Sequence, residues 1–229
     1  MAPHKPHEPR IARVAAAMAD AARSRMLAYL LSGEYASAGE LARAGSVTPA
    51  TASGHLAKLL DAGLLTCEVR GRHRYFRLAG PEVAHALEAL ALVAERSAHD
   101  KAWEHPERQR LREARCCYGH LAGRLGVRLY EGLRVHQGLQ ASAQGFELTP
   151  AGHEWLQRLE MAAPEPVGSR RYAYACLDWS ERRDHLAGQL ADALFEHCTQ
   201  RGWVRRGEGR GVELTPLGVQ RLLPALDAA

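Results

Sequence analysis

Cysteine and histidine recur together in two similar blocks in the second half of the chain. The first block begins R-C-C-Y-G-H, and the second runs A-C-L-D-W-S-E-R-R-D-H. Aligning the two blocks pairs Cys117 with Cys176 and His120 with His185. Two thiols and two imidazoles brought to one point suit a tetrahedral site for a thiophilic metal ion. The candidate metal ligands are therefore Cys117, His120, Cys176 and His185.

The same cysteines are candidates for thiol sensing. Cys116 and Cys117 are adjacent and could clamp a thiophilic ion or an organometal, or react together with Cys176 if their pKa values are lowered. Plain packing is the alternative, because cysteine is among the most buried residue types and the histidines can cap helices or lie satisfied in a core. We interpret Cys67 and Cys198 as structural.

The two blocks belong to a longer repeat. The segment HLAGRLGVRLYEGL, which begins at His120, recurs 65 residues later as HLAGQLADALFEHC at His185. The segment ELTPAGHEWLQRL, which begins at Glu147, recurs 66 residues later as ELTPLGVQRLLPAL at Glu213. A shared spacing over two segments indicates an internal duplication. Each unit reads as a helix, a short β-hairpin and a helix that Thr-Pro opens, which predicts two winged-helix-like repeats.

A different chemistry is predicted for the stretch from Ser37 to Leu78. A short helix and a turn precede a helix that Thr48 caps and that runs to about Ala62. Two strands follow, Leu64–Val69 and His73–Leu78, joined by an Arg-Gly-Arg turn. This order predicts a winged helix-turn-helix, which places its second helix in the major groove of DNA.

The predicted groove helix and hairpin carry short polar and basic side chains, which suit close approach to base edges and phosphates. Between Ala42 and Gly80 there are six cations and two anions, so this segment holds the whole +4 excess of the chain. A solvated turn with ordinary surface arginines is the alternative. The candidate DNA contacts are Thr48, Thr51, Ser53, His55, Lys58, Arg70, Arg72, Arg74 and Tyr75.

Composition and length indicate a globular, mainly α protein with small β-hairpins. The chain has 229 residues, of which 46% are hydrophobic and 24% charged. No apolar run approaches the roughly 20 residues that cross a bilayer, and the N-terminus has no secretory pattern. We therefore expect a cytoplasmic protein with reduced thiols. The expected organisation is a flexible tail (1–10), a DNA-binding and dimerisation domain (11–95), a linker helix or hinge (96–113) and an effector domain (114–229), with repeats 114–161 and 171–229.

The first ninety-odd residues resemble the ArsR/SmtB family of bacterial winged-helix repressors. The motifs that carry the resemblance are IARVAAAMADAARSRMLAYL, GELARAG, TPATASGHLAKLLDAGLL and RGRHRYFRL. The resemblance implies a homodimer that binds double-stranded operator DNA near its own promoter and leaves it when an inducer binds.

The sequence departs from the family at its usual metal sites. GELARAG has no cysteine where some members carry a pair, and the helix after the wing offers only His85 and Glu88 of a four-ligand set. Gly54 stands where many members have arginine, so one expected DNA contact is missing.

These patterns favour a sequence-specific transcriptional regulator that is not an enzyme. It is expected to be an autoregulating repressor released by a thiophilic metal or a thiol-reactive species, with no certain cofactor and no membrane partner. One alternative is a thiol-dependent enzyme with an appended helix-turn-helix, in which Cys117, Cys176 and Asp178 would be the working groups. Another is an architectural DNA-binding protein without an effector. The chain shows no base–nucleophile pair or phosphate loop at recognisable spacing, which disfavours the enzyme.

Overall fold

The computed structural model describes residues 11–95 and 105–227. The expected tail, 1–10, and much of the expected hinge, 96–104, lie outside the described residues. The chain divides into two compact units, the first comprising Met1–Leu30 with Glu34–Val83 and the second comprising Leu31–Gly33 with Ala84–Ala229. None of the described helices is both long and apolar enough to cross a membrane.

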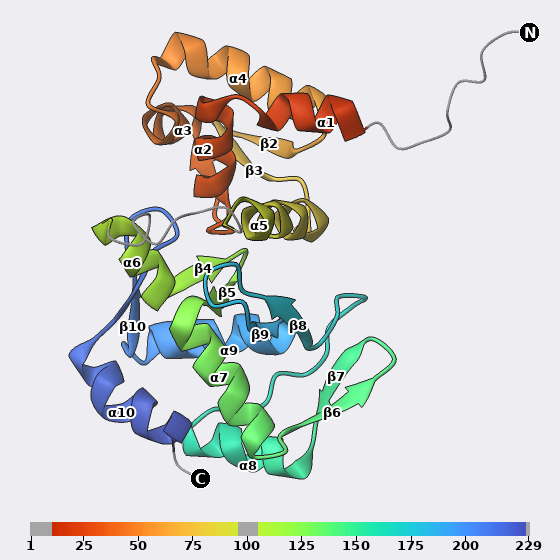
Figure 1. The fold of residues 1–229 in the computed structure, drawn as a ribbon, viewed down its shortest axis with the longest axis vertical. Helices are drawn as coiled ribbons and strands as arrows, with labels where there is room; N and C mark the ends of the chain where they lie inside the picture. Colours follow the sequence, from red (N-terminus) through yellow and green to blue (C-terminus); the bar gives the residue numbers. More distant parts are fainter. Residues whose placement is uncertain (1–10, 96–104, 228–229) are drawn as a thin grey trace, which may run out of the picture. The chain divides into compact units, whose positions relative to one another are not determined.

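The first unit is a winged helix-turn-helix (Figure 1). Its three antiparallel strands pair in the order β1-β3-β2, and β2 and β3 form the wing. Strand β1 has only two residues, too few for a visible alternation, and the sequence did not predict it. The elements are α1 (Ile11–Met18), α2 (Ala21–Leu30), β1 (Ala36–Ser37), α3 (Ala38–Gly45), α4 (Pro49–Asp61), β2 (Leu65–Arg70) and β3 (His73–Leu78).

Local hydrogen bonds explain where the two central helices begin. The Ser37 side chain accepts from the Glu40 backbone N–H at 3.3 Å, and the Glu40 carboxylate accepts from the Ser37 N–H at 2.8 Å. The Thr48 hydroxyl accepts from the N–H of Thr51 at 3.2 Å, and Pro49 takes the first helical position. These caps fix the turn that separates α3 from α4.

Helix α5 (Pro81–Glu95) follows the wing after two residues. Its first three residues group with the first unit, and the rest, from Ala84, group with the second. This helix was expected to lie in the DNA-binding domain, 11–95, whereas most of it groups with the second unit.

The second unit contains the same order of elements twice (Figure 1). Each series consists of a hairpin, a helix, a second hairpin and a second helix. The first is β4 (Arg115–Cys117), β5 (His120–Ala122), α7 (Gly123–Val135), β6 (Leu139–Ser142), β7 (Gly145–Leu148) and α8 (Pro150–Arg158). The second is β8 (Tyr174–Leu177), β9 (Asp184–Ala187), α9 (Gln189–Gln200), β10 (Val204–Arg206), β11 (Val212–Leu214) and α10 (Pro216–Asp227), and α6 (Pro106–Glu113) precedes both.

The leading hairpin of each series corrects the sequence prediction. The HLA segments at His120 and His185 were expected to open helices, but they are strands β5 and β9. Each strand passes into its helix through a glycine in the left-handed region, Gly123 with φ +75° and Gly188 with φ +98°. A Cβ at either position would lie 2.6 to 2.7 Å from a backbone carbonyl oxygen, so only glycine fits there.

The two series pack on each other reciprocally. Helix α7 of the first lies against β9 of the second, and α9 of the second lies against β5 of the first. A shared core lies between the helices, and its fully buried side chains include Leu133, Trp155, Leu156, Phe195 and Leu222. This exchange brings strands β5 and β9 side by side.

Candidate DNA-binding surface and metal site

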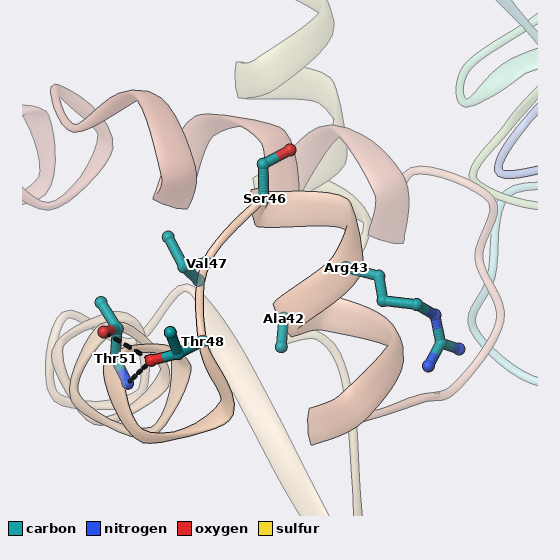
Figure 2. A pocket seen from close by; sticks show the side chains of 6 residues that line it. All are labelled: Ala42, Arg43, Ser46, Val47, Thr48 and Thr51. Carbon is teal, nitrogen blue, oxygen red and sulfur yellow. Dashed lines mark hydrogen bonds between the residues drawn. The ribbon is translucent and has the colours of Figure 1, made fainter.

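The turn between α3 and α4 forms a shallow hollow on the first unit. Its lining residues are Ala42, Arg43, Ser46, Val47, Thr48 and Thr51 (Figure 2). Thr48 and Thr51 are both exposed, and their hydroxyl oxygens lie 2.9 Å apart at the start of α4. The backbone N–H groups at the start of α4 and these two hydroxyls could form hydrogen bonds with a phosphate or a base edge.

The candidate residues along α4 differ in how they face solvent. Ser53 and Lys58 are exposed, although the Ser53 hydroxyl donates to the carbonyl of Pro49 at 3.1 Å. The side chain of His55 is only 15% exposed, because its Nδ1 faces Arg23 at 3.3 Å and Asp20 at 3.7 Å. His55 is therefore held by Arg23 of α2 and by Asp20 of the bend before it, and presents only part of its ring.

The arginines of the wing have different partners. Arg70 donates to Glu68 at 2.8 Å and lies over the ring of Tyr35, with 4.6 Å between its guanidinium carbon and the ring centre. The Nε of Arg74 donates to the thiol of Cys67 at 3.3 Å. Arg72 lies at the tip, is exposed, and forms no ion pair within the described residues. It is the wing cation most available to a phosphate.

Four side chains of the second unit converge on one point. Cys117, His120, Cys176 and His185 each offer one ligand atom, and these four atoms lie within 4.8 Å of one another. All four residues are buried, with exposed fractions from 0% to 9%. The structure thus brings together the four residues that the repeat alignment predicted as metal ligands.

Strand register explains why the four residues meet. Cys117 is the cross-strand partner of His120 in the β4–β5 hairpin, and Cys176 is the partner of His185 in the β8–β9 hairpin. Each hairpin therefore contributes one thiol and one imidazole from the same face. Because β5 lies beside β9, the two pairs meet in the buried space between the hairpins.

Hydrogen bonds within the cluster define its ligand atoms. The Nε2 atoms of His120 and His185 lie 3.1 Å apart. Because these two atoms face each other, each ring directs Nε2, and not Nδ1, toward the centre of the cluster. The hydrogen bond between the Cys117 and Cys176 thiols, together with burial, raises the pKa of Cys117 to about 12.

A carboxylate lies behind each imidazole. His185 Nδ1 is 3.4 Å from Asp178 Oδ2, and His120 Nδ1 is 4.0 Å from Asp192 Oδ1. Burial alone would raise the pKa of the Asp178 carboxyl, but Arg115 and the hydroxyl of Ser180 hold it well below its ordinary value. Carboxylates in this position orient the histidines of metal sites and make them better ligands.

The remaining cysteines lie away from the cluster. Cys116 and Cys117 point to opposite faces of β4, so the predicted vicinal clamp does not form. The Cys116 thiol lies 3.2 Å from the carbonyl oxygen of Ser32, and burial raises its pKa to about 11. Cys67 is half-buried in the wing, and Cys198 is fully buried in the core of the second unit.

Sequence reasoning missed the polar groups around the cluster. Asp178 was singled out only as a group of the alternative enzyme, Glu88 only as part of an incomplete family site, and Arg115 was not among the candidate site residues. All three are buried, and Arg115 Nη2 lies 2.9 Å from Asp178 Oδ2. No local pattern marks these three residues as a buried group, because their partners lie far away in the sequence.

Comparison with known proteins decides the family. A helix-turn-helix domain model matches residues 18–68. The uncharacterized HTH-type transcriptional regulator YdfF of Bacillus subtilis (strain 168) is 38% identical over 213 residues, which are 92% of this chain and 94% of YdfF. The chain belongs to the ArsR family of winged helix-turn-helix transcriptional regulators. The match to YdfF includes the second unit as well as the DNA-binding unit of the regulator.

Solved structures similar to the regulator cover less of it. The homodimeric winged helix-turn-helix domain of Mb0332 from Mycobacterium bovis, a possible ArsR-family regulator, is 27% identical, with a TM-score of 0.38 over 43% of this chain and 94% of that one. The cadmium sensor CmtR from Mycobacterium tuberculosis is 35% identical, with a TM-score of 0.31 over 34% of this chain and 81% of that one. The regulator binds DNA through its helix-turn-helix.

Proposed function

We propose that the regulator is an autoregulating repressor that binds its operator as a homodimer. The short polar side chains of α4 suit the major groove, and the arginines of the wing suit the adjacent sugar–phosphate backbone. Two reading heads would contact half-sites about 34–36 Å apart. The contacts would come from Thr48, Thr51, Ser53, His55, Lys58, Arg70, Arg72, Arg74 and Tyr75.

The effector in this proposal is a thiophilic divalent metal ion bound by Cys117, His120, Cys176 and His185. The convergence of four buried ligand atoms within 4.8 Å carries the proposal. Zinc–nitrogen bonds of about 2.0–2.1 Å in a tetrahedron place two coordinated nitrogens about 3.3–3.4 Å apart. The Nε2 atoms of the two histidines are already 3.1 Å apart, so the rings need almost no rearrangement.

Charge favours a divalent ion over a monovalent or trivalent one. Coordination by two thiolates and two neutral imidazoles cancels a charge of +2, and burying a net charge is costly. Zinc and cadmium satisfy this balance and accept mixed nitrogen and sulfur ligands. Binding requires that both thiols lose their protons to solvent, so metal affinity falls as the pH is lowered.

The thiol-reactive effector and the enzyme are less well supported. A sensing or catalytic cysteine needs an accessible thiolate, whereas Cys117 is fully buried and its pKa is raised to about 12. Cys176 is nearly as buried, with an exposed fraction of 9%. A bound metal would stabilise both thiolates directly, which makes the metal ion the better effector.

The second unit would have arisen by internal duplication of a winged-helix-like unit. The repeated order of elements, the matching glycines at Gly123 and Gly188 and the reciprocal packing of α7 and α9 support this origin. Duplication would also account for the composition of the metal site, because each copy supplies one cysteine and one histidine. The site would then be complete only when both copies are packed together.

The metal proposal is tested on protein purified without chelator. Elemental analysis by mass spectrometry is expected to find about one zinc or other divalent ion per chain, and a Cys117→Ser, Cys176→Ser variant is expected to lose it. Cys198→Ser is the matched control, because this thiol lies outside the cluster. Equal metal content and equal responses in the double variant and the parent would refute the site.

The DNA proposal is tested by titrating operator DNA in a gel-shift assay. Arg72→Ala is expected to weaken binding, because it removes an exposed cation at the wing tip. His55→Ala is expected to weaken it as well, since the ring braces α4 and presents one edge. Arg205→Ala, which removes an exposed arginine of a hairpin in the second unit, is the control. Unchanged promoter occupancy in both test variants would contradict the proposal.

A further inference from the structure

A buried chain of charged groups connects the metal cluster with α5. Asp178 and Arg115 are fully buried and Glu88 of α5 is 2% exposed. Arg115 Nη2 lies 2.9 Å from Asp178 Oδ2 and 3.8 Å from Glu88 Oε2. Asp178 Oδ2 is in turn 3.4 Å from Nδ1 of His185, one of the four candidate ligands. Arg115 thus has one acceptor beside the cluster and another on α5.

The Glu88 carboxylate can accept a further hydrogen bond. Its Oε1 accepts from Arg210 at 2.5 Å, whereas Oε2 is buried without a hydrogen-bond partner among the described residues. A buried carboxylate oxygen without a donor is unfavourable, and Arg115 Nη2 lies within 3.8 Å of it. Glu88 Oε2 is therefore an alternative acceptor for Arg115.

Asp178 already accepts hydrogen bonds from five donors. Its Oδ2 accepts from the backbone N–H of Gly123 at 2.7 Å and from Arg115 at 2.9 Å, and its Oδ1 accepts from the N–H and hydroxyl of Ser180 and from the N–H of Glu181. A carboxylate offers only about four acceptor sites. A further donor on Oδ2 therefore competes with those present, and the side chain of Arg115 can move more readily than the backbone at Gly123.

Metal coordination supplies that further donor. When Nε2 of His185 binds a metal, the ring proton must reside on Nδ1, which then needs an acceptor. The acceptor in reach is Asp178 Oδ2. Without a metal, one of the Nε2 atoms of His120 and His185, which lie 3.1 Å apart, donates to the other. We assign the donor role to His185, because its buried Nδ1 has no hydrogen-bond partner among the described residues and in a neutral donor ring carries no proton. The proton therefore moves from Nε2 to Nδ1 of that ring, with no net gain or loss.

We propose that Arg115 is a two-position switch that moves its Nη2 hydrogen bond from Asp178 to Glu88 when His185 coordinates the effector. The inference rests on the proposed metal-responsive function and specifies how metal binding at the cluster is transmitted to α5. Glu88 lies on α5, which begins three residues after the last residue of the wing and whose residues are divided between the two units. Shortening the 3.8 Å ion pair with Glu88 to a hydrogen bond changes how firmly α5 is held by the second unit. The metal ion would then bind the two conformations with different affinities, which any mechanism of release from DNA requires.

Tyr174 contributes a second contact between the cluster and α5. Its hydroxyl lies 2.9 Å from Nε2 of His85, which precedes Glu88 by three residues and shares its face of the helix. Tyr174 packs against the small buried cluster that contains Cys117 and Cys176. This hydrogen bond holds the part of α5 that carries Glu88 close to the four candidate metal ligands.

The test is a comparison of Glu88→Gln with Glu82→Gln in the full-length protein. Glu82 is exposed on the same helix and serves as the matched control. Zinc affinity is measured by competition with a chromophoric chelator, and operator affinity by fluorescence anisotropy with and without zinc. The ratio of the two operator affinities is the coupling factor, which for regulated binding is commonly about 5- to 150-fold.

We expect the parent and Glu82→Gln to share a coupling factor of about tenfold or more. Glu88→Gln is expected to reduce it to below about threefold, while zinc affinity and metal-free operator affinity each stay within about threefold of the parent. A coupling factor in Glu88→Gln equal to that of the parent would overturn the switch and leave the metal-responsive repressor intact. No effect of zinc on operator affinity in the parent would overturn both.

Nuclear magnetic resonance of the parent protein gives a second readout that does not depend on the folding of a variant. Guanidinium signals of Arg115, assigned with Arg115→Lys, are expected to shift on addition of zinc. Those of Arg205, an exposed hairpin arginine, are expected to stay in place. Arg115 signals that do not respond to stoichiometric zinc would also overturn the switch.

Discussion

Removal of the effector metal should destabilise the second unit and spare the first. The four candidate ligands come from β4, β5, β8 and β9, so a metal would join the leading hairpins of the two series. A ligand that binds only the folded state at 1,000 times its dissociation constant adds about 4 kcal/mol to the free energy of unfolding. For a unit of about 150 residues, each kcal/mol corresponds to roughly 2–4 °C in Tm, so zinc should raise that Tm by about 8–16 °C.

Differential scanning calorimetry with excess zinc and with excess chelator measures this shift. Cys176→Ser should abolish the difference between the two conditions. Cys198→Ala should keep it, although the cavity left in the core lowers the Tm in both conditions. The transition of the DNA-binding unit should not move with zinc. A zinc-dependent shift of equal size in Cys176→Ser and in the parent would show that the metal binds elsewhere.

Three further predictions concern single residues. Lys58→Ala should reduce the slope of log affinity against log salt by about 0.9, the amount expected for one lysine that neutralises one phosphate, whereas Arg205→Ala should leave the slope unchanged in the same titration. Hydrogen bonds from the side chain and backbone of the capping serine lower the pKa of Glu40 below 4.5, so its contribution to stability is present above about pH 4.5 and is lost as the pH falls through the folded-state pKa. Denaturation of the DNA-binding unit as a function of pH should therefore show a smaller acid-side loss in Glu40→Gln, and an equal loss would contradict the assignment. Burial raises the pKa of Cys198 to about 12, so mass spectrometry after brief alkylation of the native protein should find the half-buried Cys67 modified first, and early modification of Cys198 would refute this order.

The DNA-binding unit could be predicted from the sequence because its signals are local. The cap at Thr48, the turn at Gly71 and the alternation along the wing each involve only a few neighbouring residues. The mainly helical class with small hairpins and the ArsR-family resemblance are both confirmed. The placement of His55 could not be predicted, because Arg23 and Asp20 are more than 30 residues away in the sequence.

The second unit shows where local patterns mislead. Strands β4 and β5 have three residues each, too few for an alternation to be read, and the apolar run after His120 resembles the start of a helix. The repeat alignment nevertheless selected the four residues that converge, because each hairpin pairs its cysteine with its histidine and strands β5 and β9 lie side by side. The adjacency of Cys116 and Cys117 suggested a shared binding site, but neighbouring residues in a strand face opposite sides.

The polar groups around the cluster could not be predicted at all. The contact between Arg115 and Asp178 joins residues 63 apart, and that between Arg210 and Glu88 joins residues 122 apart. No periodicity or spacing marks such pairs, which only the tertiary packing of the second unit brings together. Charged residues of this kind look like ordinary surface residues until burial is known.

Operator affinity measured with and without zinc tests the central claim most directly. Full-length protein is titrated into a labelled promoter fragment by fluorescence anisotropy, once with stoichiometric zinc and once with chelator, and zinc occupancy is verified in the same samples. We predict that zinc weakens binding by about tenfold or more and that the Cys117→Ser, Cys176→Ser variant binds equally in both conditions. The same affinity with and without zinc, in a protein shown to hold the metal, would contradict the account.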